Sequence, residues 1–196
     1  MIQLIFATNN KNKVEEINSA IGNKIEIISL KDAGINIDIP EPHETLFENA
    51  SEKSKTIHQL TGKNCFSEDS GLEIAVLNGE PGVKSARYAG DEKIFEKNIE
   101  KVLHKLTGIN NRKAKFRTVI SLILNEKEYF FEGICDGEIN TTQRGNNGFG
   151  YDSIFKPEGS NKTFAEMTLQ EKNIFSHRKK AADKLIIFLQ KFYGKN

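Results

Sequence analysis

The fold class is decided by residues 115–139, KFRTVISLILNEKEYFFEGICDGEI. Two runs rich in β-branched and aromatic residues, 115–124 and 129–139, flank the polar stretch NEKE. This arrangement predicts a long β-hairpin. A hairpin pairs its strands antiparallel, which disfavours a plain alternating doubly wound parallel sheet.

The segments on either side of the hairpin mix strands with helices. Residues 2–7 (IQLIFA) are typical of a buried strand, and apolar residues then recur at helical spacing from Val14 until Gly22. At 65–71 the sequence predicts a short strand that enters an acidic turn. Further strands are expected over 25–30 and 72–77, a long loop over 78–90, and helices after Thr45, from Asp91 and after Thr168. We therefore predict an α/β fold with a mixed sheet flanked by helices.

Composition limits the class of protein. The 196 residues suit one domain or two closely joined lobes, and 28 basic against 27 acidic side chains leave a net charge of +1. This balance does not favour a nucleic-acid-coating protein. Cys65 and Cys135 form no metal-binding spacing and are predicted to be buried free thiols. Neither a signal peptide nor a membrane span is recognisable, so the expected location is the cytoplasm, without a membrane partner.

The first candidate site is TNNKNK, which comprises Thr8, Asn9, Asn10, Lys11, Asn12 and Lys13. It follows a predicted strand and opens a predicted helix. Helix N-termini attract phosphate, and two lysines add positive charge. The alternative is an Asn-capped helix with solvated lysines.

The second candidate site is FSEDSG at 66–71, considered together with Glu41. Paired carboxylates are suitable ligands for Mg²⁺, which takes one or two of them in addition to phosphate oxygens. The alternative is an exposed acidic turn, in which Glu68 and Asp69 are solvated.

Two further stretches could recognise a base. GNNGFGYD at 145–152 places Phe149 in a glycine-rich loop, where its ring could stack on a base or be tucked inward. EKNIFSHRKK at 171–180 gathers cations at the start of the last helix, where they are unfavourable unless an anion or a base edge is nearby. The alternative is an ordinary solvated face.

Taken in order, the motifs resemble those of the inosine triphosphate pyrophosphatase family, from Ile2 to about Leu189. The motifs are T-x-N-x-x-K, FENA at 47–50, EDSGL at 68–72, PGVKSARYAG at 81–90, NGFGYDSIF at 147–155 and SHR at 176–178. The resemblance implies an elongated mixed sheet in a single domain of two lobes with a central cleft, and a homodimer. It also implies Mg²⁺-dependent hydrolysis of ITP, dITP and XTP to the monophosphate and pyrophosphate, with no nucleic-acid partner.

The resemblance also implies roles for individual residues. Asp69 would be the general base, and Glu41, Glu68 and Asp69 would lie at the metal. The substrate would be bound by residues 8–13 and by Lys53, Ser70, Phe149, Gly150, Tyr151, Asp152, Lys172, His177 and Arg178. An acceptor such as Asp152 beside a donor such as Arg178 would fit a 6-oxopurine and leave adenine unpaired. The family often has glycine where this chain has Asn9.

Two other functions are compatible with the same residues. A pyrophosphatase for thymidine or uridine triphosphates would use the same carboxylates and lysines. A non-enzymatic module that binds nucleotides or single-stranded RNA would use Phe149, Arg178 and the basic helix start, and would bind with steep salt dependence.

Overall fold

The computed structural model describes residues 2–22 and 25–194. Its main strands are β1 (Ile2–Phe6), β2 (Ile25–Ser29), β3 (Cys65–Ile74), β4 (Pro81–Gly82), β5 (Lys113–Leu124), β6 (Lys127–Ile139) and β7 (Phe155–Pro157). Its α-helices are α1 (Lys11–Ile21), α2 (Leu46–Thr61), α3 (Phe95–Lys105), α4 (Leu169–Phe175) and α5 (His177–Tyr193). Over the part of the chain described, no helix combines the length and apolar character needed to cross a membrane.

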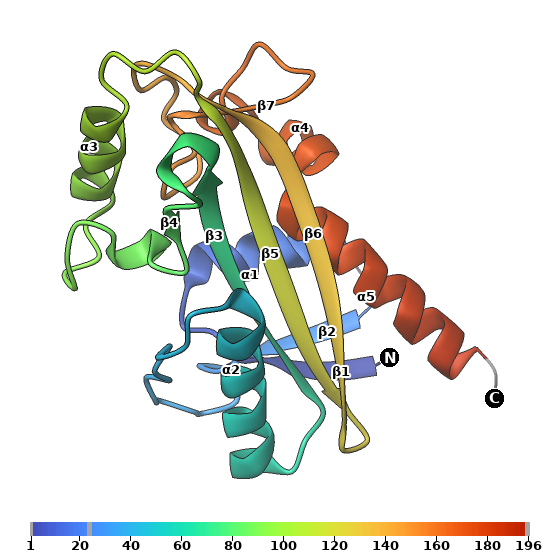
Figure 1. Cartoon of the computed structure of the whole chain (residues 1–196). Helices are drawn as coiled ribbons and strands as arrows, with labels where there is room; N and C mark the ends of the chain where they lie inside the picture. Colours follow the sequence, from blue (N-terminus) through green and yellow to red (C-terminus); the bar gives the residue numbers. More distant parts are fainter. Residues whose placement is uncertain (1, 23–24, 195–196) are drawn as a thin grey trace. The chain divides into compact units, whose positions relative to one another are not determined.

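The strands form one mixed sheet, as predicted. The strand order is β2-β1-β3-β5-β6-β7, with β4 paired to β3 (Figure 1). β1 runs parallel to both β2 and β3, whereas β4 and β7 pair antiparallel with β3 and β6. The predicted hairpin is β5–β6. Its two linking residues, Asn125 and Glu126, both have positive φ, which is typical of the tight turns that join antiparallel strands.

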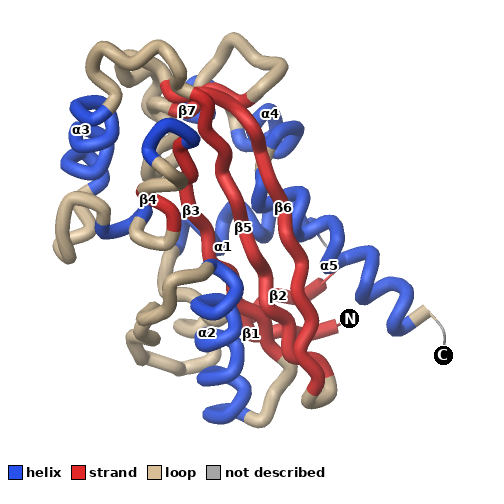
Figure 2. Tube along the Cα trace, in the orientation of Figure 1, coloured by secondary structure: helices blue, strands red, loops and turns tan. Residues whose placement is uncertain are grey.

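The chain divides into two compact units. Unit 1 contains residues 1–69, 118–133 and 177–196, and unit 2 contains residues 70–117 and 134–176. β3, β5 and β6 contribute residues to both units, and Figure 2 allows each strand to be followed along its length.

In unit 1 the strands are buried on both faces. Leu4 and Phe6 pack in one apolar cluster with α1 and α5, whereas Ile5 and Ala7 pack in another cluster with Ile57 of α2. Successive strand residues point to opposite faces of the sheet. A continuous apolar run such as IQLIFA can therefore pack against helices on both faces.

Unit 2 has its own core. Phe116, Phe155 and Phe164 contact one another, with ring centroids 4.7–6.0 Å apart. Ile99 and Val102 of α3 belong to the same cluster. Cys135 lies in this core and Cys65 lies in unit 1, and both are buried free thiols, as predicted.

The predicted turn at 67–71 is wrong. The structure has one continuous strand, β3, through the whole FSEDSG stretch, and a short 3₁₀ turn replaces the predicted strand end at 75–77. Turn-like residues were outweighed by tertiary packing: Gly71 lies directly against the backbone of Gly82 in β4, where a Cβ would not fit. The helix expected from Asp91 begins at Phe95.

Candidate active site

Two carboxylates converge on the ammonium group of Lys53 in unit 1. Lys53 Nζ lies 2.6 Å from Glu41 Oε1 and 2.9 Å from Asp69 Oδ1. Lys53 comes from α2, Asp69 from β3 and Glu41 from the segment between β2 and α2. The side chains of Lys53 and Asp69 are each 8% exposed, whereas that of Glu41 is 24% exposed, so Glu41 lies at the side of the triad that water reaches.

The caps of α2 and its spacing of buried residues place Lys53 on the buried face of the helix. Thr45 caps α2 by accepting a hydrogen bond from the Glu48 backbone N–H, as predicted, and Gly62 ends the helix in a left-handed conformation. Ala50, Ile57 and Lys53 follow at helical spacing and are all buried.

Burial dominates the titration of Asp69. It raises the pKa of Asp69 above its ordinary value, although the nearby charges of Lys53 and Lys13 oppose the shift. Burial also acts to lower the pKa of Lys53, but Asp69 and Glu41 outweigh it and raise that pKa. The triad therefore holds a carboxylate with an increased proton affinity, which suits a general base.

Glu68 lies on the opposite face of β3 from Asp69. Ser67 and Asp69 contact α2, through the Ala50 carbonyl and Lys53, whereas Glu68 contacts Arg178 of α5. Alternation along the strand thus separates two sequence-adjacent acids, each with its own cation. The exposed acidic turn considered as an alternative is wrong, because both carboxylates are buried.

The partners of Glu68 form a buried cluster. Arg178 donates to Glu68 from Nε at 2.7 Å and from Nη2 at 2.9 Å, and its Nη1 pairs with Glu16 of α1. Lys13 Nζ lies 3.1 Å from Glu68 Oε1. Burial would raise the pKa of Glu68, but Arg178 and Lys13 lower it to about 2, so the carboxylate is ionised.

Glu16 is a site residue that the sequence analysis missed. It is buried and shares a helix face with Lys13, three positions earlier. A charged residue at a position bordering the apolar stripe of Ile17, Ala20 and Ile21 was the available signal.

The TNNKNK stretch follows β1 and opens α1, as predicted, and its last three residues form the first turn of the helix. Asn10 caps α1 by accepting from the Lys13 backbone N–H at 3.3 Å, and Thr8 Oγ1 accepts from the Asn10 N–H at 3.2 Å. Asn9 Nδ2 donates to the Ile37 carbonyl at 2.8 Å. Asn9 does not have a positive φ, so the backbone here does not require glycine.

In unit 2, Asp152 anchors the glycine-rich loop. It accepts from the Phe149 backbone N–H at 3.0 Å and forms a buried ion pair with Lys172 of α4. Phe149 is half-buried, with the Lys172 ammonium 5.5 Å from its ring centre. Tyr151 is buried and donates to the Ser85 carbonyl at 2.9 Å.

The predicted site residues therefore fall into two groups. Unit 1 holds residues 8–13 with Glu41, Lys53, Glu68, Asp69, His177 and Arg178, and unit 2 holds Ser70, Phe149, Gly150, Tyr151, Asp152 and Lys172. An ordinary solvated surface, the alternative for EKNIFSHRKK, is wrong for Lys172, His177 and Arg178, which are each at most 4% exposed.

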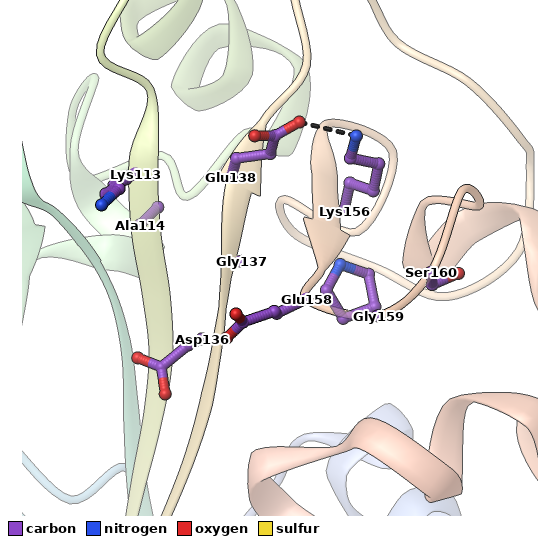
Figure 3. A pocket seen from close by; sticks show the side chains of 10 residues that line it. Lys113, Ala114, Asp136, Gly137, Glu138, Lys156, Glu158, Gly159 and Ser160 are labelled. Atoms are coloured by element: carbon purple, nitrogen blue, oxygen red, sulfur yellow. Dashed lines mark ion pairs between the residues drawn. The ribbon is translucent and has the colours of Figure 1, made fainter.

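A separate surface pocket of about 490 Å³ lies in unit 2, beside β6 and β7 (Figure 3). Lys156 and Glu138, which both line the pocket, form an ion pair with 2.6 Å between Nζ and Oε1. The charged residues that line it are Lys113, Asp136, Glu138, Lys156 and Glu158. None of the predicted site residues is among its lining residues, and its mixed charges do not point to one ligand.

The donors of unit 1 fit a hard divalent cation. Glu41 and Asp69 already place one oxygen each around a single positive charge, and carboxylate oxygens are the ligands that Mg²⁺ prefers. Within residues 2–22 and 25–194, no cluster of three or more His, Cys, Asp or Glu could hold a metal by itself. An ion at this place would therefore complete its shell with water and phosphate oxygens.

The chain is similar to known proteins over nearly its whole length. The sequence profile of the Ham1 family matches residues 4–188. A dITP/XTP pyrophosphatase of Flavobacterium johnsoniae is 50% identical over 96% of this chain and 98% of its own, and one of Porphyromonas gingivalis is 46% identical over 96% and 98%. The Ham1 protein structure of Staphylococcus aureus has a TM-score of 0.87 at 37% identity over 96% of this chain and 98% of its own. That of Coxiella burnetii has a TM-score of 0.88 at 37% identity over 97% and 100%. The chain belongs to the Ham1 family.

Proposed function

We propose that the protein is a Mg²⁺-dependent nucleoside triphosphate pyrophosphatase of the cytoplasm that removes ITP, dITP and XTP from the nucleotide pool. Family membership and the dITP/XTP pyrophosphatase activity for which its relatives are named support this proposal. The observation that carries it is the convergence of Glu41 and Asp69 on one buried cation position. We also propose a homodimer, which light scattering on the purified protein would test.

The phosphate-binding groups are those at the start of α1. Thr8, Asn9, Asn10, Lys11, Asn12 and Lys13 surround a helix N-terminus, whose unpaired N–H groups and partial positive charge favour phosphate. Lys53 and Ser70 add a cation and a hydroxyl. In this proposal Glu41 and Asp69 hold the metal, whereas Glu68 is already neutralised by Arg178 and Lys13.

Asp69 is the proposed general base. It takes a proton from water as that water attacks the α-phosphorus. The bond from the α-phosphorus to the bridging oxygen breaks, and pyrophosphate leaves with the bonding electron pair. Burial raises the pKa of Asp69, which increases the affinity of its carboxylate for the proton. Lys11 and Lys13 offset negative charge on the departing pyrophosphate. Mg²⁺, when bound, would polarise the phosphate oxygens.

Recognition of the base is proposed to use Phe149, Gly150, Tyr151, Asp152 and Lys172 in unit 2. His177 and Arg178, to which the resemblance also assigns a role at the base, lie in unit 1, where Glu68 and Glu16 engage the guanidinium nitrogens of Arg178. Phe149 offers a half-buried ring for stacking, next to the Lys172 ammonium. Asp152 offers an acceptor for the ring N1–H of a 6-oxopurine, which adenine lacks. The hydroxyl of Tyr151 donates a hydrogen bond to the Ser85 carbonyl, which restrains this part of the loop.

A substrate panel tests the proposal. Pyrophosphate release is measured from ITP, XTP, dITP, ATP, GTP and dTTP with Mg²⁺ and with EDTA. We expect Mg²⁺-dependent release that strongly favours the first three. Preference for dTTP would instead indicate a pyrimidine nucleotide pyrophosphatase. No release, together with salt-sensitive binding of oligonucleotides, would indicate a binding module.

A further inference from the structure

We propose that Lys53 occupies the place of the divalent cation in the metal-free protein, and that the metal must displace its ammonium group in order to bind. This inference rests on the proposed function and concerns how its metal site is filled. Lys53 would then be an exchangeable counterion as well as a substrate contact.

The first support is geometric. One Nζ lies 2.6 Å from Glu41 Oε1 and 2.9 Å from Asp69 Oδ1, so it sits between the two proposed metal ligands. Mg²⁺ needs oxygens at about 2.0–2.1 Å and cannot share that space with an ammonium group. Two positive charges at contact distance would also repel strongly where water is largely excluded.

The second support is the charge balance of unit 1. Glu68 forms ion pairs with Arg178 and Lys13 on the other face of β3. Glu41 and Asp69 share Lys53, and without a cation between them these two carboxylates would repel. The ammonium thus stabilises the metal-free fold and competes with the metal.

The third support concerns where the ammonium can go. Ala50 and Ile57, one turn before and one turn after Lys53, are fully buried and fix the helix. Only the flexible four-carbon stem of Lys53 is free to move its charge. A displaced ammonium needs another anion, and the triphosphate supplies one. Metal without nucleotide is therefore expected to bind weakly, and metal with nucleotide to bind well.

The test is titration of nucleotide-free protein with MgCl₂ by calorimetry. In Lys53→Met the competing charge is gone, and we expect Mg²⁺ to bind about tenfold more tightly than to the native protein, a typical size for coupling between two ligands. Lys55→Met is the matched control. Lys55 lies on the same helix, but its side chain is 54% exposed and pairs with Glu128 instead of Glu41 or Asp69, so the Mg²⁺ affinity of Lys55→Met should not change. Unchanged or weaker binding to Lys53→Met would overturn the proposal.

A measurement on the native protein covers the case in which Lys53→Met does not fold. Lysine side chains are labelled with an amine-reactive reagent, with and without saturating Mg²⁺, and each peptide is quantified by mass spectrometry. Labelling of Lys53 relative to Lys55 should rise severalfold when Mg²⁺ is present. A constant ratio would contradict displacement.

If the native protein hydrolyses ITP only with Mg²⁺ and yet fails both tests, this inference fails while the proposed function stands. If EDTA has no effect on hydrolysis, the proposed metal dependence itself fails.

Discussion

Arg178 and Glu68 lie 110 positions apart in the chain and form a two-point ion pair that is almost completely buried. Because Glu16 pairs with the remaining edge of the guanidinium group, one arginine of α5 connects β3 with α1. Burial would lower the pKa of Arg178, but the two carboxylates raise it instead. Breaking such a pair leaves an uncompensated buried charge, so we interpret the cluster as a structural anchor of unit 1.

The anchor predicts a graded loss of stability. Glu68→Gln should lower the free energy of unfolding by about 3–5 kcal/mol, since it breaks a buried pair. Glu16→Gln should lower the free energy of unfolding by about 2 kcal/mol, because Arg178 still forms its ion pair with Glu68. Glu15→Gln, at the exposed neighbouring position, should cost no more than about 0.5 kcal/mol. Urea unfolding of the three variants gives the free energy of unfolding of each. Equal losses of stability in Glu16→Gln and Glu15→Gln would contradict an anchoring role for Glu16.

Replacing the proposed base, Asp69, should strongly reduce kcat and leave the fold intact. In Asp69→Asn the amide oxygen can still accept from Lys53, so we expect a nearly unchanged circular dichroism spectrum. Loss of the proton acceptor should lower kcat for ITP by about 10²–10⁴-fold. The control is Asp38→Asn, at an exposed position, which should keep the native kcat. A near-native kcat in Asp69→Asn would exclude Asp69 as the base.

The side chain of Asn9 should restrain the segment that carries Glu41. Its side chain donates to the Ile37 carbonyl, four residues before Glu41. We expect Asn9→Gly and the nearly isosteric Asn9→Asp, which lacks the amide donor, both to increase hydrogen exchange over 35–41. Exchange in α2 should not change. If only Asn9→Gly increases exchange, the cause is backbone flexibility and the hydrogen bond is unimportant.

The thiol of Cys65 should stay unreactive to high pH. Burial raises its pKa from 9.0 to about 12, so the folded protein favours the neutral thiol. The corresponding stability is fully present below about pH 9 and is lost as the pH rises through 12. In a Cys135→Ala background, we expect no reaction of the folded protein with a thiol reagent at pH 9 and rapid reaction in urea. Rapid reaction of the folded protein would show that Cys65 is accessible.

The sequence by itself determined those features whose causes are local. The β5–β6 hairpin, the caps at Asn10 and Thr45 and the helix end at Gly62 each depend on residues within a few positions of one another. Side-chain periodicity and capping hydrogen bonds act over that range, so a single sequence is enough to find them.

The tertiary structure alone decided how Glu68 and Asp69 are used. The sequence predicted a turn, but β3 lies between β1 and β5 in the sheet and continues as one strand through both acids, which directs them to opposite faces. Their cations come from elsewhere in the chain: Lys53 is 16 positions from Asp69, and Arg178 is 110 positions from Glu68. Buried charges require partners in space, and no local pattern specifies which distant residue will provide one.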